Sequence, residues 1–120
     1  MTAPIPTEIR LRRAERLLEV DFDDGARFTL PAEYLRVESP SAEVQGHGPN
    51  ERRTIAGKRQ VALVGVEPVG NYAVRLLFDD GHDTGIFSWG YLYALGRDRG
   101  GKWEAYLAAL RAAKLSRDPQ

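Results

Sequence analysis

The segment YAVRLLFDDGHDTGIFSWGYLYAL, residues 72–95, decides the fold because a strand, a tight turn and the start of a helix follow one another in it. Apolar residues occupy every second position before the turn, which predicts the buried face of a β-strand: Tyr72, Val74, Leu76 and Phe78. The tripeptide Asp79-Asp80-Gly81 predicts a hairpin turn, because glycine adopts positive φ without strain. A return strand is expected over residues 84–87, followed by a helix that Ser88 caps.

An earlier part of the chain repeats this pattern. Residues 20–35 read VDFDDGARFTLPAEYL and residues 76–92 read LLFDDGHDTGIFSWGYL, so both contain Phe-Asp-Asp-Gly, a short strand and Tyr-Leu. The second copy has one extra residue before Tyr-Leu. The repeat predicts two related units, each a β-hairpin followed by a helix, around one core. The alternative is that both segments converge on favourable hairpin chemistry.

The remaining segments complete one predicted α+β domain over residues 7–115. Antiparallel or mixed β-hairpins form its core, and the C-terminal helices, the last of them at 102–115, pack on the sheet. Glycine and proline interrupt residues 37–60, which predicts a long loop of a functional kind. Residues 1–6 are expected to be a flexible arm and residues 116–120 a frayed tail.

The composition excludes several classes of site. The 120 residues contain no cysteine, which removes disulfides, thiolate zinc sites and cysteine nucleophiles. No apolar stretch is long enough for a signal core or a membrane span, so a cytoplasmic protein without a membrane is expected. Lysine plus arginine and aspartate plus glutamate number 17 each, and this neutral balance disfavours nucleic-acid binding.

His82, beside Asp83, is one of two histidines, and His47 lies between two glycines of the long loop. With the turn carboxylates at 23–24 and 79–80, these histidines form a candidate metal or acid–base site. Turn chemistry explains the same carboxylates, because aspartate in such turns bonds its own backbone. No nucleophile-elbow or zincin motif accompanies the histidines.

Two groups of residues are candidates for contact with a partner. The long loop carries the basic residues Arg52, Arg53, Lys58 and Arg59, and the helix predicted after Ser88 begins with the aromatic residues Trp89 and Tyr91. A basic run of this kind is more often a solvated loop, and aromatic residues at helical spacing are more often core.

The sequences LPAEYLR at 30–36 and DDGHDTGIFSWGYL at 79–92 resemble a small domain family related to the N-terminal domain of gamma-butyrobetaine dioxygenase. The resemblance covers residues 7–112. In those dioxygenases the domain precedes a separate barrel that holds iron and 2-oxoglutarate. This sequence lacks that barrel, so the resemblance does not imply hydroxylase activity. Related domains attached to P-loop NTPases of iron–sulfur cluster assembly imply an accessory role.

The resemblance also implies where a zinc site lies in relatives. The dioxygenase domain binds zinc through three cysteines and one histidine, whose positions fall here at Ser39, Ser41, Val44 and His82. Three of the four ligands are therefore missing, and the hydroxyl of serine is a poor zinc ligand. The interpretation is a degenerate zinc site, with no cofactor. In its place, the hydroxyls of Ser39 and Ser41, a bond from His82 to Glu38 or Glu43, and burial of Val44 are expected to hold the loop.

These observations predict a non-catalytic accessory or protein-interaction module and not an enzyme. Its expected partner is a protein, such as a metalloenzyme or an iron–sulfur assembly protein acting in trans. The alternative is a metal-binding domain that uses His82 with His47 and the turn carboxylates.

Overall fold

The structure, a computed structural model, describes residues 3–46 and 53–119. Within these ranges two three-stranded antiparallel sheets, ordered β1-β2-β3 and β4-β5-β6, combine with four helices. The elements in chain order are β1 (Pro6–Arg12), β2 (Leu17–Phe22), β3 (Arg27–Pro31), α1 (Ala32–Val37), α2 (Ala42–Gln45), β4 (Leu63–Val69), β5 (Ala73–Phe78), β6 (Gly85–Ser88), α3 (Trp89–Arg97) and α4 (Arg99–Ala113). This architecture confirms the predicted α+β fold. No helix in these ranges is long and apolar enough to cross a membrane.

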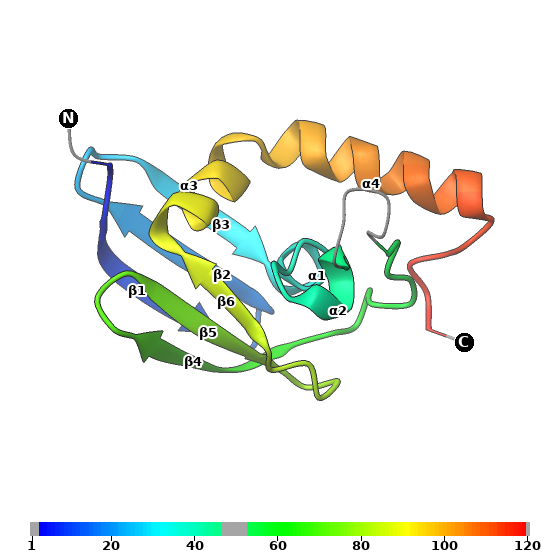
Figure 1. Cartoon of the computed structure of the whole chain (residues 1–120), viewed down its shortest axis with the longest axis horizontal. Helices are drawn as coiled ribbons and strands as arrows, with labels where there is room; N and C mark the ends of the chain where they lie inside the picture. The colour runs from blue at the N-terminus through cyan, green and yellow to red at the C-terminus, as the bar shows by residue number, and fades with distance from the viewer. Residues whose placement is uncertain (1–2, 47–52, 120) are drawn as a thin grey trace.

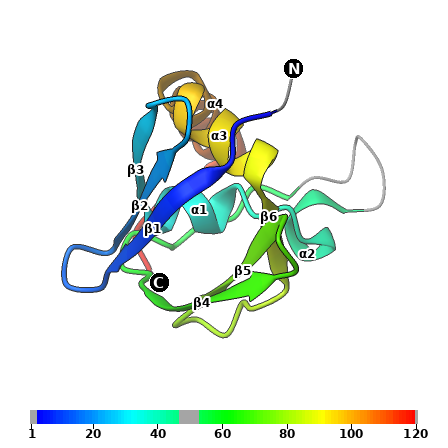
Figure 2. The same ribbon diagram turned by 90° about the vertical axis from the view of Figure 1, so that its left-hand side faces the viewer.

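The core lies between the two sheets and the helices α1 and α3 (Figures 1 and 2). Helix α3 packs against β3 of the first sheet and β6 of the second. Alternate residues of the central strands are buried, and the largest fully buried side chains come from both halves: Leu18, Leu30, Tyr34, Leu76, Phe87 and Leu92. A second, smaller cluster joins Val37 at the end of α1 to Tyr106 and Leu110 of α4.

The two sheets are built to the same plan, residue for residue. Pro6 pairs with Phe22 as Leu63 pairs with Phe78, and a β-bulge follows each of these pairs. From there the register of β1 with β2 matches that of β4 with β5 through the pairs Arg12–Leu17 and Val69–Ala73. The sequence repeat therefore extends to three strands and a helix in each half.

The two Asp-Asp-Gly turns have the same hydrogen bonds. Gly25 and Gly81 both adopt a φ of 90°, the left-handed conformation that glycine favours. The second aspartate of each turn accepts a bond from the amide two residues later, Asp24 from Ala26 and Asp80 from His82. The first aspartate accepts from an amide next to the opening strand, at Ile5 in the first half and at Ala62 in the second.

Each half is also bound by the helix of the other. The hydroxyl of Tyr34, in α1, donates to the carbonyl of Leu95, and the hydroxyl of Tyr91, in α3, donates to the carbonyl of Glu38. In both cases the acceptor lies four residues after the other tyrosine. We call these two bonds the reciprocal tyrosine clamp. Burial raises the pKa of Tyr34, so this hydroxyl keeps its proton.

Side chains two residues after the tyrosines extend the symmetry. Arg36 reaches the carboxylate of Asp80 at 2.8 Å, and Tyr93 reaches that of Asp24 at 2.6 Å. Each turn is thus held by its own backbone bonds and by a side chain from the opposite half.

Several predicted boundaries were wrong for physical reasons. The irregular loop contains the one-turn helix α2, because Ser41 caps it. Helix α4 begins at Arg99, three residues before the predicted start, since its glycines lie in the first turn, where few intrahelical bonds depend on them. Tyr72 lies outside β5 and is 57 % exposed. Pro68 continues β4, because this strand forms an edge of its sheet.

Both ends of the domain are held more firmly than the predicted arm and tail. Ile5 is bonded to Asp23 through its amide and its carbonyl. After α4, the carbonyls of Ser116 and Arg117 accept bonds from the segment at 57–59. Arg117 forms two hydrogen bonds with Glu33 and lies over the ring of Trp103. Residues 116–118 of the predicted tail thus make polar contacts with the domain, while Ser116 and Asp118 remain exposed.

Replacing Leu76 by alanine should lower the free energy of unfolding by about 2–5 kcal/mol, because its fully buried side chain leaves a cavity. Phe78→Ala should fall in the same range. The neighbouring Leu77 is only partly buried, so Leu77→Ala serves as the control and should cost less. Urea unfolding of the variants measures the difference. Equal losses at 76 and 77 would contradict the assignment of the buried face.

Candidate functional site

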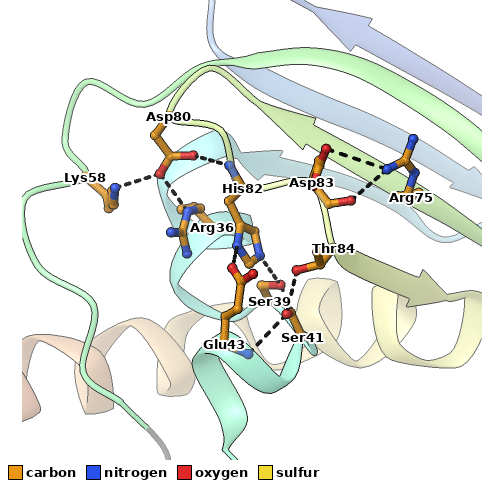
Figure 3. A network of polar contacts seen from close by, with 10 residues as sticks. All are labelled: Arg36, Ser39, Ser41, Glu43, Lys58, Arg75, Asp80, His82, Asp83 and Thr84. Atoms are coloured by element: carbon orange, nitrogen blue, oxygen red, sulfur yellow. Dashed lines mark hydrogen bonds and ion pairs between the residues drawn. The ribbon is translucent and has the colours of Figure 1, made fainter.

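The candidate site lies where the turn between β5 and β6 meets the segment that follows α1 (Figure 3). Ser39 and Ser41 come after the end of α1, and the hydroxyl of Ser41 accepts the amide of Glu43 at 3.2 Å, which starts α2. His82 follows Gly81 in the turn. All four predicted positions, Ser39, Ser41, Val44 and His82, come from these two segments, and their side chains are buried.

Both ring nitrogens of His82 are engaged. Nε2 lies 2.8 Å from Oγ of Ser39, and Nδ1 lies 2.8 Å from a carboxylate oxygen of Glu43. The His82 side chain is 1 % exposed. Since Ser39 Oγ already accepts the amide of Ser41, we assign the hydroxyl proton to the bond toward Nε2 and the ring proton to Nδ1. The bond to Glu43 is one of the two that the sequence predicted.

The surrounding contacts close the site. The hydroxyl of Ser41 bonds to that of Thr84 at 2.7 Å, and Val44 is fully buried. Gly85 lies directly against Ser39, because a methyl group on Gly85 would stand 2.5 Å from Ser39 Oγ. The position therefore requires glycine for close approach and leaves no space beside the serine hydroxyl.

Ser39, His82 and Glu43 form a serine–histidine–carboxylate chain, but its exposure is the reverse of what nucleophilic catalysis needs. A catalytic triad presents the hydroxyl to substrate and buries the acid. Here Ser39 is fully buried, whereas Glu43 is 62 % exposed. With Gly85 against its oxygen, Ser39 cannot reach an incoming carbonyl. The chain is thus arranged to join α2 to the turn.

The donor set does not fit a zinc ion. Val44 offers only hydrocarbon, and the two serines offer hydroxyls where zinc prefers thiolate or imidazole. The residues at 3–46 and 53–119 contain no group of three or more histidines, cysteines, aspartates and glutamates that could hold a metal. His47, part of the alternative metal site, lies outside the described residues. Asp79 accepts the amide of Ala62, so it is used in its own turn.

The Asp80 carboxylate accepts the backbone amide of His82 and faces two cations, without contact to the imidazole ring (Figure 3). Arg36 binds its carboxylate at 2.8 Å and Lys58 at 2.6 Å. Burial favours the neutral acid, but the hydrogen bonds from Lys58, the His82 amide and Arg36 outweigh it and lower the pKa of Asp80 to about 2. The carboxylate is therefore a structural anion that holds α1 and the segment at 58 to the turn.

Comparisons with known proteins identify the family. A family model described as "Gamma-butyrobetaine hydroxylase-like, N-terminal" matches residues 9–93. The chain belongs to the gamma-butyrobetaine hydroxylase-like N-terminal family. The comparison with curated proteins found no match.

Three solved structures resemble this chain. An NMR solution structure is 50 % identical with a TM-score of 0.85 and covers 99 % of this chain and 94 % of its own. A second NMR structure is 52 % identical with a TM-score of 0.84, covering 99 % and 92 %. A crystal structure of a protein of unknown function from Acidithiobacillus ferrooxidans, in the DUF971 family, is 46 % identical with a TM-score of 0.64 and covers 76 % and 91 %.

Most of the residues predicted to contact a partner protein are bonded to other residues of this chain. Lys58 binds Asp80 and Arg59 binds Asp118. The indole of Trp89 donates to the carbonyl of Asn71, and Tyr91 is part of the clamp. Arg53 is exposed, and Arg52 lies outside the described residues.

Sequence reasoning missed Arg36 and Thr84 as members of the site. Both contact predicted residues, Arg36 through Asp80 and Thr84 through Ser41. The repeat contained a signal for Arg36, because it occupies the position of Tyr93 in the other half, two residues after the repeated tyrosine. No comparable signal pointed to Thr84.

Removal of divalent metals should leave the melting temperature of this family member unchanged, because Ser39 and Glu43 hold both ring nitrogens of His82. Calorimetry with EDTA and then with added zinc measures this. His82→Ala should lose about 1–3 kcal/mol of stability in either condition, since it breaks both bonds. A fall of several degrees in EDTA that zinc reverses would show that the site binds metal.

The Asp80 carboxylate predicts a specific pH dependence. Its stabilising effect is fully present above the unfolded pKa of 3.8 and is lost as pH falls through about 2. Asp80→Asn should therefore cost about 1–2 kcal/mol at neutral pH, with screening allowed for, and less near pH 2. Urea unfolding at both pH values measures this, with the exposed Asp83→Asn as control. An equal cost of Asp80→Asn at both values would contradict the ionised pairing.

Proposed function

We propose that the chain is a non-catalytic protein-interaction module that assists a metalloenzyme or an iron–sulfur assembly protein in the cytoplasm. The observation that supports this proposal is that the candidate catalytic groups are buried or bonded to other residues of the protein. Ser39 is buried, and His82 is bonded on both ring nitrogens. Such a site stabilises the attachment of α2 to the turn and offers no reacting atom to a substrate.

The family supports an accessory role. Its description names the N-terminal part of hydroxylase-like proteins, and we take this wording as support for a role beside an enzyme. The degenerate zinc site fits the same role, because a domain whose fold is held by polar bonds and by Val44 no longer requires the ion.

A cleft between α4 and the segment at 53–55 provides a surface for a partner. It has a volume of about 290 Å³, and its walls include Ile55 and Tyr106. Arg53 and Lys102 contribute two cations to its lining, against one anion from the buried Glu38. An apolar floor with cations suits an acidic side chain or a C-terminal carboxylate of a protein partner. The cleft thus gives the exposed part of the basic loop a defined role.

The experiment is capture from a cell lysate on immobilised chain, followed by binding measurements with the purified captured protein. Arg53→Glu should weaken that binding at least about tenfold, because it places an acid in the cleft. Arg13→Glu, an exposed reversal at the hairpin between β1 and β2, is the matched control and should bind like the parent. Failure to retain any protein specifically, or equal binding by both variants, would contradict the proposed surface.

A further inference from the structure

The two sheets have the same architecture, but their outer faces differ in polarity. Because their registers match, each outward position in the first sheet has an equivalent in the second. Four polar residues of the first sheet correspond to four apolar residues of the second: Thr7 to Val64, Arg12 to Val69, Asp21 to Leu77 and Thr29 to Ile86. The outer face of the first sheet thus serves as a reference for a solvated face. At these four positions the second sheet carries an apolar residue in place of a polar one.

The apolar residues of the second sheet are accessible. Val64 is 45 % exposed and Ile86 is 46 % exposed, while Leu77 and Val69 are partly buried. Tyr72, 57 % exposed, stands at the hairpin beside them. Figure 2 shows the outer face of β4, β5 and β6 on the lower side of the molecule, away from α3 and α4. We call this surface the β4–β6 face.

One ion pair lies in the middle of the β4–β6 face. Glu67 and Arg75 are opposite each other in register, and their side chains are bonded. The equivalent pair in the first sheet, Arg10 and Glu19, joins a larger ionic network with Glu8, Asp21 and Arg12. Arg75 also lies 3.8 Å from the carboxylate of Asp83, which precedes β6. The centre of the β4–β6 face therefore combines apolar residues with one cation and one anion, and a second anion stands at its edge.

We propose that the β4–β6 face binds the same face of a second copy of this chain. A two-fold axis parallel to the strands, between β4 and β5, places Glu67 of one copy across from Arg75 of the other. Both charges then find opposite partners, whereas an acidic or a basic partner would satisfy only one of them. This self-association uses a different surface from the cleft and is independent of the proposed function.

The size of the face sets the strength of the association. Three strands about 4.8 Å apart, with up to seven residues at about 3.4 Å each, make a face of roughly 300 Å². Stable dimers bury about 800 Å² on each partner. The association is therefore weak, with a dissociation constant on the order of 1 mM.

Charge exchange at the ion pair tests the proposal. Amide spectra of the full ¹⁵N-labelled chain, recorded from about 0.05 to 2 mM, bracket the expected constant. The parent chain should show concentration-dependent shifts at residues 64 and 77, with slower tumbling. Glu67→Arg alone and Arg75→Glu alone should each weaken self-association at least about tenfold, because like charges then face each other. Mixing these two variants should restore association, since every cation again meets an anion.

A matched pair of variants distinguishes association through this face from non-specific association. Val64→Lys should abolish the concentration dependence, and Thr7→Lys, at the equivalent position of the first sheet, should leave it intact. Unchanged melting temperatures confirm that the exposed substitutions preserve the fold. The proposal is overturned if the parent spectra do not change with concentration, if the shifts map to the first sheet, or if the mixed charge variants fail to associate.

Discussion

The structure depends on the reciprocal tyrosine clamp. Tyr34 and Tyr91 each donate a hydroxyl to a carbonyl of the opposite half, so each half supplies a hydrogen bond to the other. A hydrogen bond of this kind contributes about 1 kcal/mol, and its removal weakens the contact between the halves. Arg36 and Tyr93 add a second level, because they bind the turn carboxylates across the same boundary. Two three-stranded β-meanders, which also share one hydrophobic core, form one domain in this way.

Against this symmetric frame, the differences between the halves indicate where the chain is specialised. The second turn carries His82 where the first has Ala26, and Lys58 adds a cation to Asp80. The segment after α1 packs against His82 through Ser39 and Glu43. Ser39 and His82, which the resemblance implied as zinc-ligand positions, thus serve here to attach α2 to the second hairpin. We interpret the cluster as a structural replacement for a metal site, which agrees with the proposed non-catalytic role.

The sequence predicted those parts that local chemistry determines. Alternating apolar residues gave the buried face of β5, and Asp-Asp-Gly gave both turns, because glycine at positive φ is a local requirement. The repeat showed the relation between the halves but not the bonds from each helix to the opposite half. Arg36 and Thr84 were missed because their partners lie more than 40 residues away. The start of α4 was predicted three residues late, because Gly100 and Gly101 are unfavourable inside a helix and lie here in its first turn.

The clamp makes the two halves one cooperative unit, and native-state hydrogen exchange of Tyr91→Phe tests this directly. The variant loses a bond from the second half to the carbonyl of Glu38 in the first. If the halves unfold together, the protection of core amides in β2 and in β5 should fall by the same amount, about 1 kcal/mol. A loss confined to one sheet, with the other at its parental protection, would contradict the account.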